Sequence, residues 1–188
     1  MLNLANNLTL IRILAVPVIV LLLYFPNQAT CLLAMITFIL ASVTDFFDGL
    51  LARKYNLVSS MGKLLDPLAD KLLVTSALIM LVQLDWLQAW IVILIIGREM
   101  TVTGVRAMAA DRGQVIAADK YGKMKTIMQV LAICPLMLHY SWWGFDPVPL
   151  GTVLIWIALL LTLFSGGNYL YRFIRSWNEE PLAGNDRR

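Results

Sequence analysis

Residues 45–70 begin with Asp45-Phe-Phe-Asp48-Gly-Leu-Leu-Ala-Arg53 and end, after eight further residues, with Gly62-Lys-Leu-Leu-Asp66-Pro-Leu-Ala-Asp70. In each half the acids lie three or four residues apart, which places both on one face of a helix. The polar link Lys54–Ser60 is short, so the two helices would be antiparallel neighbours. At the helical rise, the outer acids would lie about 12 Å from the link and the inner acids about 6 to 8 Å. The pattern therefore predicts four carboxylates that meet in one cleft at two matched depths.

The clustered carboxylates predict a metal site. Four of them repel one another strongly in a low-dielectric cleft, so they need cations or protons. Hard oxygen ligands favour two Mg²⁺ or Mn²⁺ ions, and such ion pairs support displacement at phosphorus. Gly49, Ala52 and Gly62 leave room beside the acids, and Arg53 is suited to bind a phosphate through two donors. The alternative is two salt-bridged helix ends, but too few basic residues lie on these faces to neutralise four acids.

The composition is that of a membrane protein. The 188 residues are 60% hydrophobic and only 14% charged, with a mean hydropathy of +0.75, whereas a soluble domain carries a more charged surface. Six apolar runs approach the ~20 residues that span a bilayer, and they are too long for strands. We therefore predict an all-α, polytopic membrane helical bundle of one domain (1–188), with a short interfacial segment (1–7), a loose tail (176–188) and spans at Leu8–Phe25, Thr30–Leu51, Leu64–Leu84, Trp86–Ala109, Met124–Tyr140 and Leu150–Tyr171.

Basic residues are absent from every second connection between these spans. Pro26–Ala29, the neighbourhood of Asp85 and Ser141–Pro149 contain no Lys or Arg. All fifteen basic residues lie in the other connections, in the helix halves that face them, or in the tail. The positive-inside rule then places both termini and the acid cluster in the cytoplasm. The net charge of +3 reflects this topology and some attraction for anionic lipid, and it does not indicate a nucleic-acid partner.

Ionisable residues also lie deep in the fourth span. Arg98 and Glu99 are far from either end of the run, and charges at such depth usually face a polar cavity. Glu99 and Arg106 are seven residues apart and share a helical stripe, from which Arg98 points about 100° away. An internal ion pair that fixes packing is one interpretation. The basic residues around the third cytoplasmic connection have two interpretations of their own, as topology determinants only or as a pocket for a phosphorylated acceptor beside the acid cluster: Arg112, Lys120, Lys123 and Lys125.

The spacing Asp-x2-Asp-Gly-x2-Ala-Arg-x8-Gly-x3-Asp-x3-Asp resembles the signature of the CDP-alcohol phosphotransferase family at all eight fixed positions. The resemblance implies that one metal ion is held by Asp45, Asp48 and Asp66, and the other by Asp45, Asp66 and Asp70. It also implies that Asp70 is the general base that takes the proton of the acceptor hydroxyl, a role that needs a carboxylate within hydrogen-bond reach.

The start of the chain is similar to the same family's Pro-Asn-x2-Thr-x2-Arg opening, with Ala5 where proline is usual. Without the resemblance, Asn6 would cap the first helix and Arg12 would snorkel to the membrane surface. With it, polar residues of this segment lie beside the nucleotide. The residues that we expect near CDP are then Asn6, Thr9, Gly49, Ala52, Arg53, Ser59 and Gly62.

The sequence from Gly97 to Gln129 resembles that of the bacterial phosphatidylglycerophosphate synthases of this family. This resemblance implies transfer of the phosphatidyl group of CDP-diacylglycerol to sn-glycerol 3-phosphate, with release of CMP, by a homodimer in the bacterial inner membrane. The lipid tails would stay in the bilayer while CDP and the acceptor stay in water. The residues that we expect at the acceptor phosphate are Arg98, Arg106, Arg112, Lys123 and Lys125.

Two alternatives remain. A transferase of the same family could use another acceptor, such as inositol phosphate or phosphatidylglycerol, because the signature at residues 45–70 is common to these enzymes. Buried acids and basic residues could instead serve a cation or proton-coupled transporter. Discontinuous helices or an inverted repeat would favour a transporter, and the sequence shows no convincing internal repeat.

Overall fold

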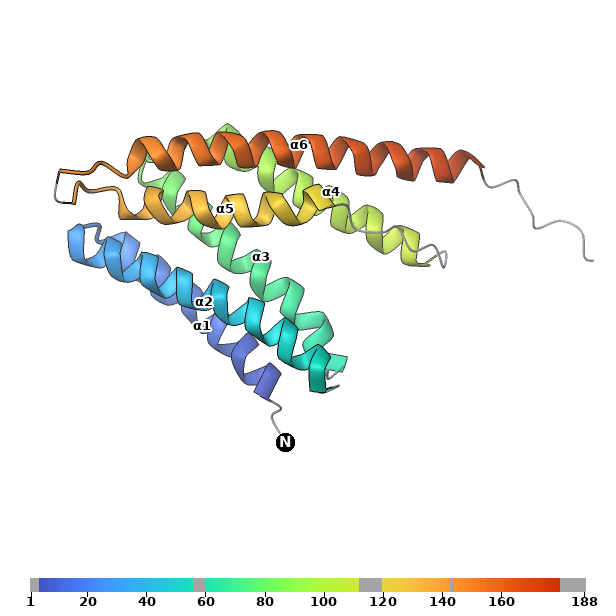
Figure 1. Ribbon diagram of the computed structural model, residues 1–188, viewed down its shortest axis with the longest axis horizontal. Helices are drawn as coiled ribbons and strands as arrows, with labels where there is room; N and C mark the ends of the chain where they lie inside the picture. The colour runs from blue at the N-terminus through green and yellow to red at the C-terminus, as the bar shows by residue number, and fades with distance from the viewer. Residues whose placement is uncertain (1–3, 56–59, 112–119, 143, 180–188) are drawn as a thin grey trace, which may run out of the picture.

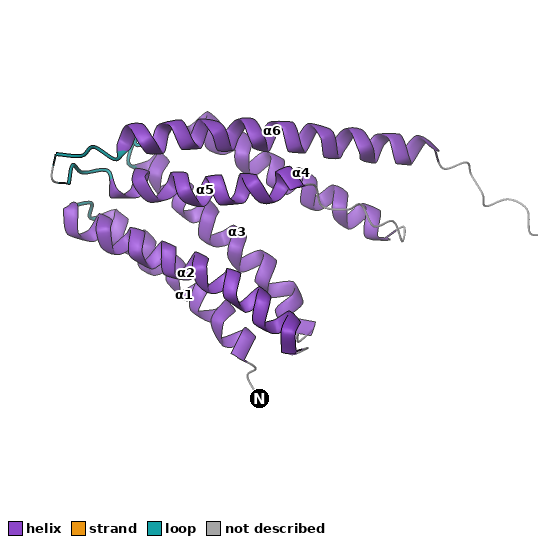
Figure 2. Ribbon diagram, in the orientation of Figure 1, coloured by secondary structure: helices purple, strands orange, loops and turns teal. Residues whose placement is uncertain are grey.

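A computed structural model describes the backbone of residues 4–55, 60–111, 120–142 and 144–179, and the side chains of residues 9–44, 68–110, 124–142 and 144–175. Within these residues the long elements are all helical (Figure 2). The predicted all-α class and the six helices are confirmed. The helices are α1 (Leu4–Tyr24), α2 (Gln28–Tyr55), α3 (Ser60–Gln83), α4 (Ala89–Asp111), α5 (Lys120–Leu138) and α6 (Val148–Glu179).

The helices extend beyond several of the predicted apolar runs. α2 continues to Tyr55 and α3 begins at Ser60, so the predicted polar link is shorter than expected. α1 begins at Leu4, which places Asn6 inside the helix, where it cannot be the N-cap. α6 continues to Glu179, so the first residues of the predicted loose tail are helical. The reason is that hydropathy marks where contact with lipid ends, whereas the backbone hydrogen-bond ladder continues into the polar region.

The six helices form two groups in contact (Figure 1). α5 and α6 lie side by side, and α4 packs against α6. α1 packs against both α2 and α3, while α2 and α3 each contact α5 and thereby join the two groups. α3 also contacts α4. α3 therefore lies against both α4 and α5, and side chains of these three helices line the candidate site.

The three connections without basic residues lie together at one end of the bundle (Figure 1). The Tyr140 hydroxyl donates a hydrogen bond to the carbonyl of Pro26 at 3.2 Å, which joins the α5–α6 connection to the α1–α2 connection. Trp86, between α3 and α4, stacks on His139 with ring centroids 3.8 Å apart. The segments that the positive-inside rule groups on one side are thus in contact in the fold.

The bundle has an apolar interior and an apolar perimeter. Leu23, Phe38, Leu81 and other residues of the helices form one buried cluster. Large apolar side chains also point outward from all six helices; Leu21 and Ile93, for example, are each 67% exposed. A soluble protein rarely leaves so much contiguous apolar surface in water. The exposed perimeter is therefore consistent with lipid around the bundle.

One described helical segment, Val148–Arg175, is long and apolar enough to cross a membrane by length and composition. Only a third of its most apolar window is buried inside the protein, so most of that surface faces outward. Shorter apolar stretches occur at Thr9–Tyr24, Gln28–Thr44 and Met124–Leu138. Within the described residues, α3 and α4 contain neither a segment long and apolar enough to cross a membrane nor one of the shorter apolar stretches. α4 carries Arg98, Glu99 and Arg106, and charged residues lower the hydropathy of a helix.

Candidate functional site

The four predicted acids lie on two neighbouring helices. Asp45 and Asp48 are in α2, Asp66 and Asp70 are in α3, and these helices contact each other. The predicted helical setting of both pairs is therefore present. Of the four side chains, only that of Asp70 is described, and it is half-buried. Within the described side chains there is no group of three potential metal ligands, and the meeting of the four carboxylates stays a prediction.

The predicted CDP contacts fall mostly outside the described side chains. Gly49, Ala52 and Arg53 belong to α2 and Gly62 to α3, whereas Ser59 lies outside the described backbone. Asn6 belongs to α1, and its side chain is not among those described. Thr9 is described and is 1% exposed, as is Arg12 one turn further along α1. Arg12 therefore does not snorkel to the membrane surface but lies inside the protein, where α1 contacts α2 and α3.

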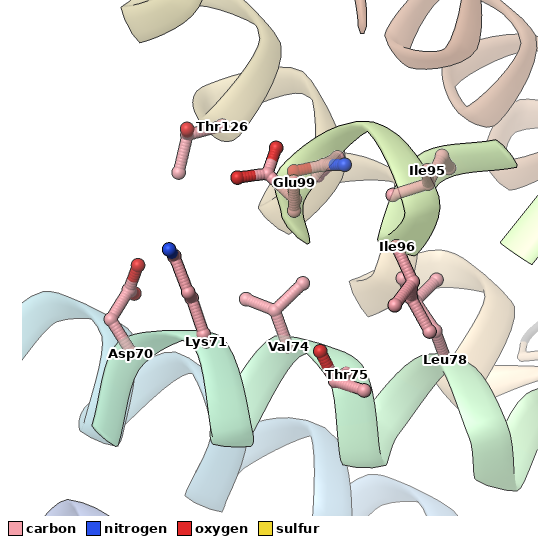
Figure 3. A pocket seen from close by; sticks show the side chains of 10 residues that line it. Asp70, Lys71, Val74, Thr75, Leu78, Ile95, Ile96, Glu99 and Thr126 are labelled. Carbon is pink, nitrogen blue, oxygen red and sulfur yellow. The ribbon is translucent and has the colours of Figure 1, made fainter. Parts of the chain in front are cut away.

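A pocket lies among α3, α4 and α5, next to Asp70 (Figure 3). Its polar wall is formed by Asp70 and Lys71 on one side and by Glu99 and Thr126 on the other, and these side chains face one another across the space. Beyond them the pocket becomes apolar. The full lining consists of Asp70, Lys71, Val74, Thr75, Leu78, Ile95, Ile96, Glu99, Thr126 and Gln129.

The Glu99 carboxylate is the centre of a charge cluster that joins two helices. It accepts from Arg98 at 3.2 Å on its own helix and forms an ion pair with Lys125 of α5. Lys125 is only 5% exposed. A cation at this depth is costly without a counter-charge, and removal of one member of such a pair leaves an uncompensated charge. Lys125, which we predicted at the acceptor phosphate, is therefore beside the pocket and already neutralised by Glu99.

Arg98 connects α4 to α6. Its guanidinium donates to the hydroxyl of Ser165, and the aliphatic part of its side chain lies against Gly166. A Cβ atom at Gly166 would lie 2.7 Å from Cγ of Arg98 and 3.1 Å from its Nε. The absence of a side chain at Gly166 is thus what admits Arg98 between the helices. These contacts favour the interpretation of Arg98 as a packing residue over that of a phosphate ligand.

Arg106 occupies a different environment. Its guanidinium lies over the ring of Tyr169 in α6, 5.6 Å from the ring centroid, while the residue itself is exposed. A cation over an aromatic face is held in position but keeps its hydrogen-bond donors available. Arg106 is therefore an accessible and oriented cation. Lys123 belongs to α5, but its side chain is not among those described, and Arg112 lies outside the described residues.

Several polar residues of the pocket were missed from the sequence, among them Lys71 and Gln129. Lys71 donates to the hydroxyl of Thr103, and this hydroxyl in turn donates to the backbone carbonyl of Glu99 at 2.7 Å. Lys71 therefore joins α3 to the charged part of α4. Gln129 is buried in α5 and lines the same pocket. Both could have been noticed in the sequence, because each is a polar residue at the edge of an apolar run. The sequence alone does not show which residue of a neighbouring helix such a side chain contacts.

Comparisons with known proteins cover nearly the whole chain. The family model described as CDP-alcohol phosphatidyltransferase matches residues 2–164. A Bacillus subtilis protein named CDP-diacylglycerol–glycerol-3-phosphate 3-phosphatidyltransferase is 42% identical over 94% of this chain and 96% of its own length. A Rickettsia typhi protein of the same name is 42% identical over 89% of this chain and 94% of its own length. A probable phosphatidylglycerophosphate synthase of Mycobacterium tuberculosis (strain H37Rv) is 41% identical over 92% of this chain and 82% of its own length.

The contact between Gly166 and Arg98 predicts a difference between two adjacent glycines. Gly166→Ala forces the Arg98 side chain to move, and overpacking of this kind costs about 1–3 kcal/mol. Gly167→Ala is the matched control, because a Cβ there meets nothing within 4 Å and alanine favours the helix. We expect thermal unfolding in detergent to occur at a lower temperature for Gly166→Ala than for Gly167→Ala. Equal unfolding temperatures would show that Arg98 is not held against α6.

Proposed function

This chain belongs to the CDP-alcohol phosphatidyltransferase family, and we propose that it transfers the phosphatidyl group of CDP-diacylglycerol to sn-glycerol 3-phosphate. The observation that carries this assignment is the 42% identity, over nearly the full length of both chains, to a relative that is named for this reaction. The family predicted from residues 45–70 is confirmed, and the chain is an enzyme of phospholipid biosynthesis. The alternative of a transporter is thereby set aside.

The proposed reaction is a displacement at phosphorus. The oxygen of the acceptor hydroxyl forms a bond to the phosphorus that carries diacylglycerol, the bond from this phosphorus to the CMP oxygen breaks, and CMP leaves. The hydroxyl proton passes to a base, for which we propose Asp70. This carboxylate is half-buried at the polar wall of the pocket, where an acceptor can approach it. A base must lie within hydrogen-bond reach of the proton that it takes.

Members of this family generally depend on a divalent metal ion. The donor set of this chain fits such an ion, because the four aspartates supply the hard oxygen ligands that Mg²⁺ and Mn²⁺ prefer. We propose two ions, held by Asp45, Asp48 and Asp66 and by Asp45, Asp66 and Asp70. When bound, they would neutralise the pyrophosphate of the donor and stabilise the CMP leaving group. Arg53, on the same helix as two of the ligands, would add a cation for the CDP phosphates.

For the phosphate of the acceptor we propose Arg106 as the principal contact. It is exposed and held over Tyr169, so its donors remain available to an anion. Lys125 contributes positive charge beside the pocket but is already paired with Glu99. Lys123, in the first turn of α5, and Arg112, outside the described residues, stay predicted contacts of the acceptor phosphate.

The lipid substrate requires a site at the membrane surface. We propose that the bundle crosses the bacterial inner membrane six times, with both termini and the pocket on the cytoplasmic side. The exposed apolar perimeter and the absence of basic residues at the opposite end support this orientation. The homodimer implied by the resemblance stays a prediction, and the mass of the purified protein in detergent would test it.

An assay with purified protein tests the reaction directly. Labelled CDP-diacylglycerol is supplied with glycerol 3-phosphate, inositol phosphate or phosphatidylglycerol in turn. We expect CMP and phosphatidylglycerol phosphate with the first acceptor, and no turnover after chelation of divalent ions, because the acids then lack their counter-charge. Preference for another acceptor would overturn the assignment, and full turnover with chelator would exclude the metals.

Asp70→Asn should lower turnover by about 10²–10⁴ while CDP-diacylglycerol still binds, as for loss of a general base.

Steady-state kinetics test the acceptor pocket. Arg106→Ala should raise KM for glycerol 3-phosphate roughly 10-fold or more, because a charge-assisted contact to the phosphate is lost, and should change KM for CDP-diacylglycerol little. Lys125→Ala should act in the same direction more weakly. Arg172→Ala removes the same charge from another exposed position and serves as the control. If Arg106→Ala weakens CDP-diacylglycerol and leaves glycerol 3-phosphate unaffected, the acceptor phosphate binds elsewhere.

Single cysteines test the orientation. A cysteine at Ser59, between α2 and α3, should react with a membrane-impermeant thiol reagent only from the cytoplasmic face, and one at Ser141, between α5 and α6, only from the outer face. Cys31 and Cys134 are replaced in both variants, so that only the introduced thiol reports. Reaction of both positions from the same face would mean that the number of spans between them is even.

A further inference from the structure

Gln129 is the one residue of the pocket lining whose side chain has a buried polar atom without a hydrogen-bond partner among the described residues. Gln129 lies in α5, is 3% exposed, and its Nε2 atom has no hydrogen-bond partner among the described residues. The same residue lines the pocket next to Asp70. A buried donor without a partner costs free energy, so native proteins rarely keep one without a function for it. Because Gln129 lines the pocket, a molecule bound there can supply a partner for this amide.

The other polar groups around the pocket indicate whether this partner is charged or neutral. Lys71 is engaged with Thr103, and Glu99 carries the charges of Arg98 and Lys125. Each of these charged side chains therefore already has a polar or ionic partner within the protein before a substrate enters. A neutral amide is suited to a neutral hydroxyl, with which it can form a hydrogen bond, whereas an anionic phosphate is better bound by the exposed Arg106.

The acceptor supplies a hydroxyl at the required place. In sn-glycerol 3-phosphate the reacting hydroxyl and the second hydroxyl are on adjacent carbons, with the phosphate on the third. If the reacting hydroxyl is at Asp70, the second hydroxyl lies one carbon further along the acceptor, in the same pocket. Gln129 lines this pocket together with Asp70.

We propose that Gln129 is a specificity-determining residue, whose amide hydrogen-bonds the non-reacting hydroxyl at C2 of the acceptor. The inference rests on the proposed function and adds a contact to it. Its consequence is discrimination against acceptors that lack this hydroxyl, because such an acceptor leaves the buried amide without a partner. A site that hydrogen-bonds a substrate hydroxyl rejects the analogue lacking it more strongly than an apolar site does.

The test compares two acceptors that differ only at C2. 3-Hydroxypropyl phosphate has the same phosphate and the same primary hydroxyl as glycerol 3-phosphate but no second hydroxyl. We expect the wild-type protein to use it with a kcat/KM roughly 10- to 100-fold lower, as for the loss of one buried hydrogen bond. Gln129→Leu should lower kcat/KM for glycerol 3-phosphate by a similar factor and change that for the analogue less than about 3-fold, so that the discrimination collapses.

Controls separate this role from a structural one. Thr162→Val removes a hydroxyl that is also buried without a partner among the described residues but does not line the pocket, and it should leave the discrimination unchanged. Gln129→Leu should unfold at the same or a higher temperature, because it removes an unpaired polar group. Gln129→Met, which keeps the length of the side chain, repeats the comparison if the leucine variant does not fold.

The outcomes are distinct. An equal loss with both acceptors would mean that Gln129 only supports the shape of the pocket, and unchanged kinetics with both would mean that its amide does not face the acceptor; either result overturns the inference. Failure of the wild-type protein to turn over glycerol 3-phosphate would instead refute the proposed function itself.

Discussion

The ion pair between Glu99 and Lys125 is the interaction on which the polar interior of this bundle depends. Charges in an apolar helix bundle are tolerated only when they are matched, because the cost of removing an ion from water is several kcal/mol. Glu99 receives Lys125 from α5 and Arg98 from α4, and Arg98 reaches Ser165 of α6. Glu99 thereby joins α4 to α5, and Arg98 joins α4 to α6. The pocket beside it can be polar because its charged side chains have ionic or hydrogen-bond partners within the protein.

This arrangement separates two kinds of cation that look alike in the sequence. Lys125 and Arg98 are engaged inside the protein, whereas Arg106 is exposed and only oriented, by the ring of Tyr169. A buried pair is held for structure and electrostatic balance, and an exposed cation is free to exchange water for a substrate anion. The sequence predicted all three residues at the acceptor phosphate, whereas the structure favours Arg106 as the contact and leaves Lys125 and Arg98 with partners inside the protein. The same reasoning separates Gln129, a neutral group at the pocket wall, from the cations that would hold phosphate.

The bilayer explains why the site is built at this depth. Exposed apolar side chains cover the perimeter of the bundle, and the ends without basic residues gather on one side. A donor such as CDP-diacylglycerol has tails that remain in lipid and a nucleotide that remains in water. The pocket is polar at Asp70 and has apolar residues toward Leu78, which suits the boundary between lipid and water in the proposed orientation.

The sequence by itself determined the helical class, the six helices and the family. These follow from local features of the sequence: the length of the apolar runs, and the spacing of the eight fixed positions of the signature from Asp45 to Asp70. It also indicated that Glu99 and Arg106 share a stripe, but not what either one meets. The tertiary structure alone decided three features: the ion pair of Glu99 with Lys125, the contact of Arg98 with Gly166, and the burial of Arg12 inside the protein. The physical reason is that helical periodicity fixes the direction of a side chain on its own helix, whereas its partner depends on how neighbouring helices are rotated and how closely they approach.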